Sequence, residues 1–177
     1  MFAPVSRAGH PPEALAPQAR AFGPTVVAKA LREALAADTI FLAVRSESHR
    51  NLASALPSWA GKTLVDATNS HAPLEEMDGL LSSAFVAKPY AGAKVVKGVN
   101  HLGATALAVD PVVPGGHRVV FLASDDEDAA ASVAIPAKEF GFSPFHLVRF
   151  DEGCALVHAR GAVWCPLIFQ NMFEKEP

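Results

Sequence analysis

The stretch Thr39-Ile-Phe-Leu-Ala-Val44 sets a pattern that recurs along the chain: a short apolar run ends directly in polar residues, here Arg45 and Ser46. Lys62-Thr-Leu-Val-Asp66 repeats it and continues as Ala67-Thr-Asn-Ser70. Short runs rich in Ile, Leu, Val and Phe are typical of strands in a parallel sheet that is covered on both faces. The pattern therefore predicts an α/β fold built on such a sheet.

Working outward from these two segments, further apolar runs alternate with Ala-rich stretches. Strands are predicted at Met1–Ser6, Thr25–Val27, Thr39–Val44, Lys62–Asp66, Lys94–Asn100, Arg118–Ala123 and Pro144–Arg149. Helices are predicted at Pro12–Phe22, Val27–Ala36, Ser48–Leu56, Ser82–Ala87, Asp126–Phe140 and Glu152–Met172. Strand–helix alternation without an internal repeat or linker indicates a single domain over residues 1–177, with a doubly wound, mostly parallel sheet.

The helix predicted at Asp126–Phe140 has clear signals at both ends. Ser124 and Glu127 have the spacing of a capping box, and Gly141 is a suitable C-terminal residue. The acidic residues at 125–128 are better explained by the helix dipole than by a metal site. Pro136 lies inside this helix, where it would introduce a kink or cost about 3 kcal/mol.

Composition excludes several classes of protein. Half of the 177 residues are apolar and 19% are charged, which is enough to form a core. The net charge of −3 gives no basic surface for nucleic acid or anionic membranes. No apolar run reaches the roughly 20 residues of a membrane span. Since Met1–Arg7 does not resemble a signal peptide, we expect a cytoplasmic protein.

The cysteines and histidines indicate neither a disulfide nor a metal site. Cys154 and Cys165 would lie roughly 16 Å apart along one helix, which is too far for a disulfide. The seven histidines do not have the spacing of metal ligands.

Polar residues follow four of the predicted strands, and the carboxyl ends of parallel strands usually border a ligand cleft. These residues are Ser6-Arg7, Arg45-Ser46, Asp66–Ser70 and Asn100-His101. Each cluster also has a purely structural explanation as a helix cap, a turn or an exposed side chain. Arg7 is the most informative, because an Arg after the second strand of a dinucleotide-binding fold accommodates the 2′-phosphate of NADP.

Motifs of hydrolases and nucleoside triphosphatases are absent: the sequence contains no GxSxG, HExxH or P-loop. This leaves the catalytic residues unknown. It fits an enzyme whose cofactors carry the hydride chemistry, and it fits a non-catalytic binding module equally well.

Three loop segments resemble the coenzyme F420-dependent NADP oxidoreductase family. They are Asp38-Thr-Ile-Phe-Leu-Ala-Val44, Thr63-Leu-Val-Asp-Ala-Thr-Asn69 and Val95-Val-Lys-Gly-Val-Asn100, and the likeness continues through 119–126 to the C-terminal helix. The resemblance implies a Rossmann-like fold, NADP as cofactor, and hydride transfer to a deazaflavin or flavin. It also implies a long apolar C-terminal helix containing Trp164, Leu167, Ile168, Phe169, Met172 and Phe173, through which a homodimer could form.

The resemblance implies a role for each loop. Ser6 and Arg7 match the segment that binds the 2′-phosphate, and Ala43 and Val44 match the loop along the dinucleotide, although Arg45 stands where the family has Pro. Thr68 and Asn69 match the loop near the nicotinamide. Asn100 and His101 match the edge of the pocket for the hydride partner.

The largest departure from the family is the absence of a GxGxxG turn, which normally cradles the pyrophosphate. The sequence opens inside what should be the second strand. Two explanations stay open: Met1 is an internal methionine of a longer enzyme, or the protein has lost this element and its sheet is rearranged or completed by a partner. In either case we expect weak or absent NADP binding by this polypeptide. The alternative function is a Rossmann-like module that acts through ligand binding or dimerisation.

Overall fold

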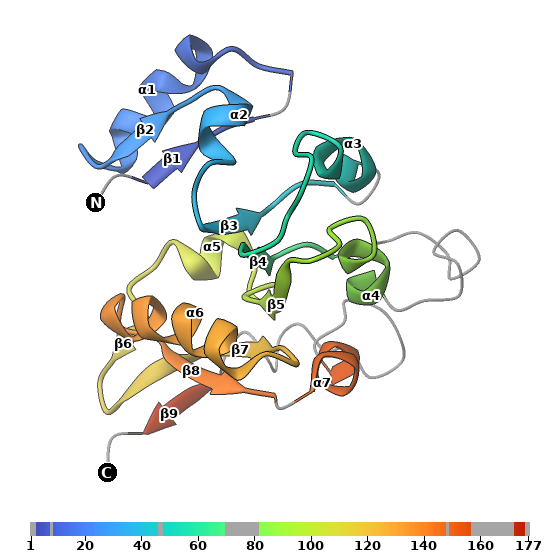
Figure 1. Ribbon diagram of the computed structural model, residues 1–177. Helices are drawn as coiled ribbons and strands as arrows, with labels where there is room; N and C mark the ends of the chain where they lie inside the picture. The colour runs from blue at the N-terminus through green and yellow to red at the C-terminus, as the bar shows by residue number, and fades with distance from the viewer. Residues whose placement is uncertain are drawn as a thin grey trace.

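The computed structural model describes residues 3–7, 9–45, 48–69, 82–147, 149–156 and 172–175 (Figure 1). The strands are β1 Ala3–Val5, β2 Val26–Ala28, β3 Thr39–Leu42, β4 Thr63–Asp66, β5 Lys94–Gly98, β6 Val112–Val113, β7 Gly116–Ala123, β8 Ser143–His146 and β9 Phe173–Lys175. The helices are α1 Pro12–Phe22, α2 Leu31–Ala34, α3 His49–Ala53, α4 Ser82–Ala87, α5 Ala104–Leu107, α6 Glu127–Glu139 and α7 Phe150–Leu156.

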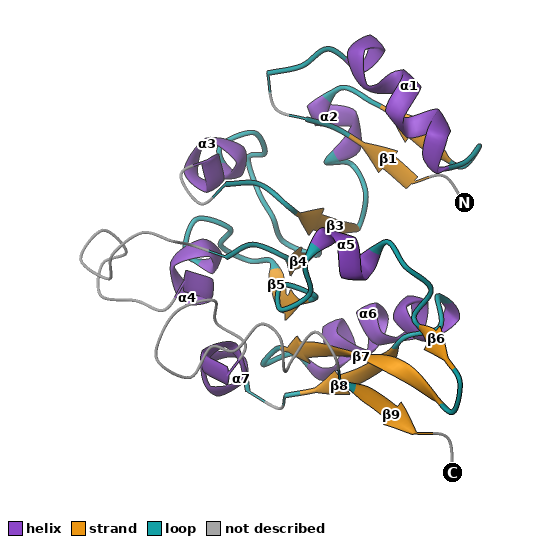
Figure 2. Cartoon of the chain, turned by 180° about the vertical axis from the view of Figure 1, so that it is seen from behind, coloured by secondary structure: helices purple, strands orange, loops and turns teal. Residues whose placement is uncertain are grey.

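The strands form two sheets. β1 and β2 pair in parallel as a separate two-stranded sheet under α1. The larger sheet has the order β3-β4-β5-β7-β6, with β8 and β9 also paired to β7. Strand β3 pairs with β4, and no ladder joins it to β1 within the described ranges. Figure 2 shows β1 and β2 set apart from the larger sheet, with α3, α4 and α7 in a row along one side of the molecule.

Strand direction follows the prediction only in part. β3, β4 and β5 run parallel, as does the β7–β8 pair, so the α/β class and a sheet rich in parallel pairs are confirmed. β7, however, runs antiparallel to β5, and β6 and β9 are also antiparallel to β7. The prediction of a mostly parallel sheet therefore describes the β3-β4-β5 half better than the half around β7.

The core is centred on β4, β5 and β7. One cluster packs Leu64 and Val86 against the aromatic rings of Trp59 and Tyr90, which meet edge to face at 4.8 Å. A second cluster packs α6 against the side chains of β4, β5 and β7. The expectation that every strand is covered on both faces is wrong for β3, because Phe41 is 58% exposed.

Helix α6 begins one residue later than predicted and is capped differently. Its N-cap is Asp126, whose carboxylate accepts a hydrogen bond from the Ala129 N–H at 2.8 Å. The Ser124 hydroxyl donates instead to the Val95 carbonyl on β5, so the predicted Ser124 capping box is wrong. The helix continues through Pro136, and the Phe140 N–H donates to the Pro136 carbonyl.

The predicted C-terminal helix is described only at its start. α7 ends at Leu156, and Trp164, Leu167, Ile168 and Phe169 lie outside the described residues. Met172 is not helical, and Phe173 belongs to β9, so placing these two residues in the helix is wrong. β9 lies so close to β7 that a Cβ at Gly116 would collide with the Glu174 carbonyl.

Candidate functional site

The centre of the candidate site is a buried ion pair at the carboxyl end of β4. Asp66 is the last residue of β4 and is fully buried, and its neighbour across the ladder is Lys97 on β5, which is 2% exposed. The Lys97 ammonium lies 2.9 Å from the Asp66 carboxylate. Removal of both charges from water is costly, so the pair depends on its close geometry and its further hydrogen bonds.

Those further hydrogen bonds hold the loop that follows β4. The Asp66 carboxylate accepts from the Thr68 N–H at 2.9 Å and from the Thr68 hydroxyl at 2.6 Å. The Lys97 ammonium also donates to the Thr68 carbonyl. The buried side chains of Asp66 and Lys97 thus hold Thr68, and with it the loop that follows β4, in a fixed position.

A pair of asparagines joins this loop to the end of β5. The Asn69 amide donates to the Asn100 carbonyl at 2.7 Å, and the Asn100 amide donates to the Asn69 side-chain oxygen at 3.0 Å. Between β5 and Asn100 lies Val99, with a φ of 55°, a conformation that is costly for a β-branched residue. Backbone strain of this kind is concentrated at functional sites.

The loop after β3 lies next to the loop after β4. Leu42 and Asp66 are register partners, and the Ala67 N–H donates to the Leu42 carbonyl at 3.1 Å. Ala43 and Val44 follow directly, with Ala43 exposed and Val44 packed against the core. The predicted residues at 43–44, 68–69 and 100 are therefore brought together at one edge of the larger sheet.

Ser6 and Arg7 follow β1 and so belong to the two-stranded sheet. The Arg7 side chain is exposed, and no carboxylate of the described residues pairs with its guanidinium. No hydrogen bond within the described ranges links Ser6 or Arg7 to the loops after β4 and β5. The arginine is available to an anionic group.

His101 is buried rather than lining a surface. Its ring is 1% exposed and lies 4.8 Å from the Phe121 ring, measured between centroids. Its Nε2 is 3.4 Å from the Val119 carbonyl, while Nδ1 has no hydrogen-bond partner in the described part of the chain. Burial lowers the pKa of His101 to about 4, against a smaller opposing effect of the Val119 carbonyl. The imidazole is therefore neutral at pH 7.

A second buried histidine lies next to the ion pair and was not predicted as a site residue. His49, at the start of α3, is 1% exposed, and its Nδ1 is 3.0 Å from the Tyr90 hydroxyl. Burial lowers the pKa of His49; the Asp66 carboxylate opposes this and the Lys97 ammonium adds to it. Burial likewise raises the pKa of Tyr90. Both side chains are uncharged at pH 7.

Sequence reasoning missed Lys97 as well as His49. A lysine within the apolar run of β5 was a usable signal, because a charge in such a run needs a buried partner. Asp66, at the end of the neighbouring strand, was the available candidate. Nothing comparable marked His49, since its burial depends on the packing of Tyr90 against α3.

The chain is similar in part to a known protein family and to individual known proteins. Residues 5–70 match the family described as NADP oxidoreductase coenzyme F420-dependent. Over 110 residues, 62% of this chain, it is 30% identical to the rat metalloreductase STEAP3. The chain spans only 22% of that relative's length.

Two solved structures extend the comparison. A hypothetical protein from Sinorhizobium meliloti, SMa0349, is 30% identical, with a TM-score of 0.84 over 99% of this chain and 84% of its own. A protein from Arthrobacter sp. FB24, described as a putative F420-dependent NADP-reductase, is 25% identical, with a TM-score of 0.65 over 82% of this chain and 74% of its own. None of the helices in the described ranges has the length and apolarity needed to cross a membrane.

Proposed function

Because residues 5–70 match the family described as NADP oxidoreductase coenzyme F420-dependent, and a putative F420-dependent NADP-reductase has a similar structure, we propose that the chain serves hydride transfer between NADP(H) and a deazaflavin or flavin. One observation carries the proposal: the ion pair of Asp66 and Lys97 and the amide pair of Asn69 and Asn100 fix two neighbouring loops at the carboxyl edge of a Rossmann-like sheet. In sheets of this kind, dinucleotides bind at that edge.

NADP(H) supplies the hydride when it is bound, so the protein's task is to bind and orient two ring systems. We assign Ser6 and Arg7 to the 2′-phosphate and Ala43 and Val44 to the dinucleotide backbone. Thr68 and Asn69 would position the nicotinamide end, and Asn100 would border the space for the hydride partner. His101 is buried against β7, so we assign it no contact with the hydride partner. No acid or base is required of the protein.

The residues present fit the two ends of NADP better than its middle. Arg7 offers an exposed cation for the 2′-phosphate, and the loops after β4 and β5 are held together at the edge assigned to the nicotinamide end. The 177 residues contain no GxGxxG turn to accept the pyrophosphate through backbone N–H groups. We therefore expect this polypeptide to bind NADP(H) weakly.

The alternative proposal is a non-catalytic Rossmann-like module that acts through ligand binding or as a homodimer. The separation of β1 and β2 from the larger sheet favours it, because a dinucleotide would have to contact both sheets. The two proposals differ in whether NADPH is oxidised in the presence of deazaflavin or flavin.

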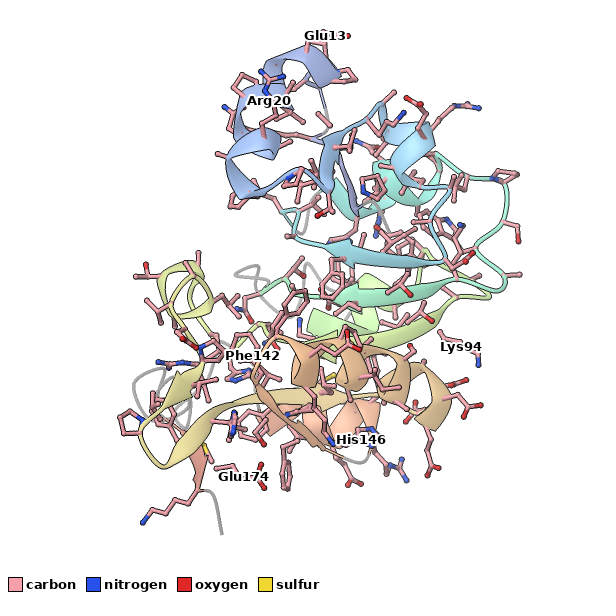
Figure 3. All side chains as sticks on the ribbon, turned by 90° about the vertical axis from the view of Figure 1, so that its left-hand side faces the viewer. Glu13, Arg20, Lys94, Phe142, His146 and Glu174 are labelled. Atoms are coloured by element: carbon pink, nitrogen blue, oxygen red, sulfur yellow. The ribbon has the colours of Figure 1, made fainter. Side chains whose placement is uncertain are left out.

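Arg7→Ala tests the assigned 2′-phosphate site. We expect NADPH binding to weaken roughly 10- to 100-fold, because the variant loses one or two charge-assisted hydrogen bonds to the 2′-phosphate. NADH lacks the 2′-phosphate, so its affinity should not change. Fluorescence titration with NADPH and with NADH measures the ratio of the two affinities, and Arg20→Ala is the control variant. Arg20 is an exposed arginine on α1, well away from β7 and β8 (Figure 3). If the ratio of NADPH to NADH affinity is the same in Arg7→Ala and wild type, the assignment is wrong.

A further inference from the structure

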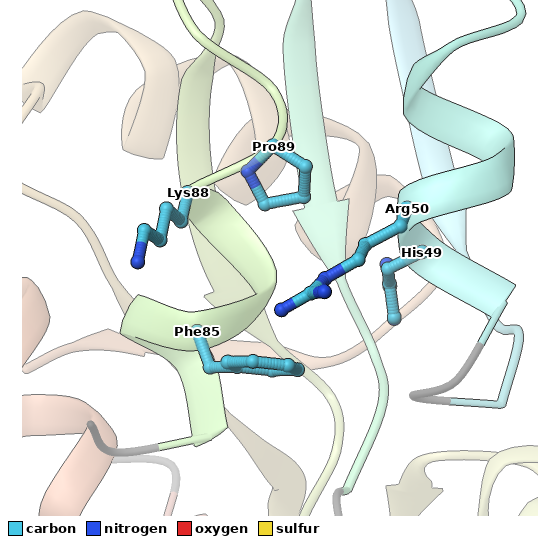
Figure 4. Close-up of a pocket in the computed structure, with 5 residues that line it drawn as sticks. All are labelled: His49, Arg50, Phe85, Lys88 and Pro89. Atoms are coloured by element: carbon cyan, nitrogen blue, oxygen red, sulfur yellow. The ribbon is translucent and has the colours of Figure 1, made fainter. Parts of the chain in front are cut away.

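The buried ion pair of Asp66 and Lys97 lies on the face of the sheet that α3 and α4 cover. Asp66 comes two residues after Leu64 on β4, so the two side chains lie on the same face. Leu64 belongs to the apolar cluster that includes residues of α3 and α4. These helices also meet through a cation–π contact, in which the Arg50 guanidinium carbon lies 5.7 Å from the centre of the Phe85 ring (Figure 4). The pair is therefore buried beneath a layer of helix, on the opposite side of the sheet from α6.

An ion pair in such a setting does not by itself add stability. Apolar side chains of similar size in the same place usually give a fold that is equally stable or more stable. Apolar side chains cannot, however, form the directed hydrogen bonds to Thr68. The Thr68 N–H and hydroxyl donate to the Asp66 carboxylate, and the Thr68 carbonyl accepts from the Lys97 ammonium. The specific effect of the two charges is therefore on the position of the loop after β4.

Thr68 passes this position on along the chain. It is 5% exposed, and its N–H, hydroxyl and carbonyl are all bonded to the ion pair. Thr68 thus serves a bound dinucleotide through the path of its backbone rather than through its side chain. The next residue, Asn69, is half-buried and donates to the Asn100 carbonyl at 2.7 Å. The position of Thr68 therefore sets that of Asn69, and with it the turn after β5.

The loops after β4 and β5 are joined by two sets of contacts. Lys97 on β5 bonds to Thr68, and Asn69 bonds to Asn100. Between Lys97 and Asn100 the backbone passes through Val99, with a φ of 55°. A conformation that is costly for a β-branched residue persists only where the surrounding contacts fix it. Those contacts run from the ion pair through the loop after β4 to the amide pair.

We propose that Asp66 and Lys97 are positioning residues for the nicotinamide end of NADP(H). They fix Thr68, and through it the amide pair of Asn69 and Asn100, in the arrangement that accepts the nicotinamide ring. This inference rests on the proposed function and deepens it, because it concerns the same site. Its consequence is that the ion pair can be made apolar without loss of the fold, but not without loss of recognition of the nicotinamide end.

The double variant Asp66→Leu and Lys97→Met removes both charges and leaves no buried charge unpaired, so we expect it to fold. In hydrogen exchange without nucleotide, the side-chain amides of Asn69 and Asn100 should exchange at least about tenfold faster than in wild type, because the loops open locally. Val96→Ala is the control, since it truncates a buried side chain of β5 in the cluster under α6. It should lower the free energy of unfolding and leave the exchange of both amides unchanged.

NADPH and 2′-phospho-ADP-ribose test recognition, because the second compound carries every part of the dinucleotide except the nicotinamide. Wild type should prefer NADPH by about fivefold or more, which corresponds to one hydrogen bond at the nicotinamide end. In the double variant this preference should fall below about twofold, because the affinity for NADPH falls and that for 2′-phospho-ADP-ribose does not. Val96→Ala should keep the wild-type preference. Two-dimensional NMR titration measures both affinities.

Thr68→Val is the second variant, and it replaces the double variant if that chain does not fold. It keeps both charges and the side-chain volume and removes only the hydroxyl that donates to Asp66. It should raise the exchange rate and lower the preference for NADPH in the same directions. The inference is overturned if the variant that folds exchanges its asparagine amides as wild type does, or keeps the wild-type preference. A wild type without preference for NADPH would instead contradict the proposed function, whereas unchanged exchange with an intact preference would contradict the positioning role alone.

Discussion

Replacement of Asp66 by Leu is expected to lower the free energy of unfolding by about 3 to 5 kcal/mol, the usual cost of removing one partner of a buried ion pair. The Lys97 ammonium, 2% exposed, would lose its counter-charge without gaining water. The Thr68 N–H and hydroxyl would lose their acceptor at the same time. Urea unfolding at pH 7 measures the loss, which is large against the 5–15 kcal/mol that typically stabilises a domain.

The double variant Asp66→Leu and Lys97→Met separates the effect of an unpaired buried charge from the effect of altered packing on stability. Because it leaves no unpaired buried charge, it should recover most of the lost stability. The surface pair of Lys94 and Asp126, 2.8 Å apart and partly exposed, supplies the control: Lys94→Met should cost far less than Asp66→Leu, because solvent-exposed ion pairs contribute little to stability. If Asp66→Leu costs no more than Lys94→Met, or if the double variant is less stable than the single one, the ion pair does not hold the loop.

Acidification is expected to destabilise the fold through His101. The folded pKa of about 4 lies below the ordinary value of 6.5, so between these values the unfolded chain binds a proton that the folded chain does not. The stability contributed by neutral His101 is thus fully present above pH 6.5 and is lost as the pH falls through 4. Integrated over that window, the loss is about 3 kcal/mol from this residue.

The variant His101→Leu isolates this contribution, because Leu keeps an apolar side chain beside Phe121 and cannot be protonated. Unfolding free energies measured from pH 7 to pH 4 should fall less steeply for His101→Leu than for wild type, by about 3 kcal/mol over the range. His146→Gln, which changes an exposed histidine on β8, should follow the wild-type curve. Parallel curves for wild type and His101→Leu would show that His101 is protonated in the folded protein as readily as in the unfolded chain.

Apolar periodicity predicted which segments form elements, but not how the strands are directed. The bounds of α1 and α4 agree with the structure, and β4 begins one residue later than predicted. The antiparallel arrangement of β7 was missed because an apolar run has the same composition in either direction. The short elements α5 and β6 turn the chain between β5 and β7, and neither has a strong signal of its own. Phe173 looked helical because it follows an apolar stretch, whereas backbone pairing with β7 decides its conformation.

The loops of the site could be predicted because they follow the ends of apolar strands. The pairing of side chains across strands could not, because it depends on the register between the strands. The loops at 68–69 and 100 follow apolar strands, so their proximity could be expected, and the asparagine pair confirms that they meet. Lys97 requires the register of β4 against β5, which places it opposite Asp66. The burial of His101 was missed because the same residue after a strand can face either solvent or the next strand, and here β7 covers it.

Titration of the ¹⁵N-labelled chain with NADPH and NADH maps where the dinucleotide binds. NADPH at millimolar concentration is expected to shift the amide resonances of Arg7, Val44, Thr68, Asn69 and Asn100, and NADH should shift the same loops except at Arg7. The absence of shifts in the loops after β3, β4 and β5 would contradict a dinucleotide site at this edge of the sheet.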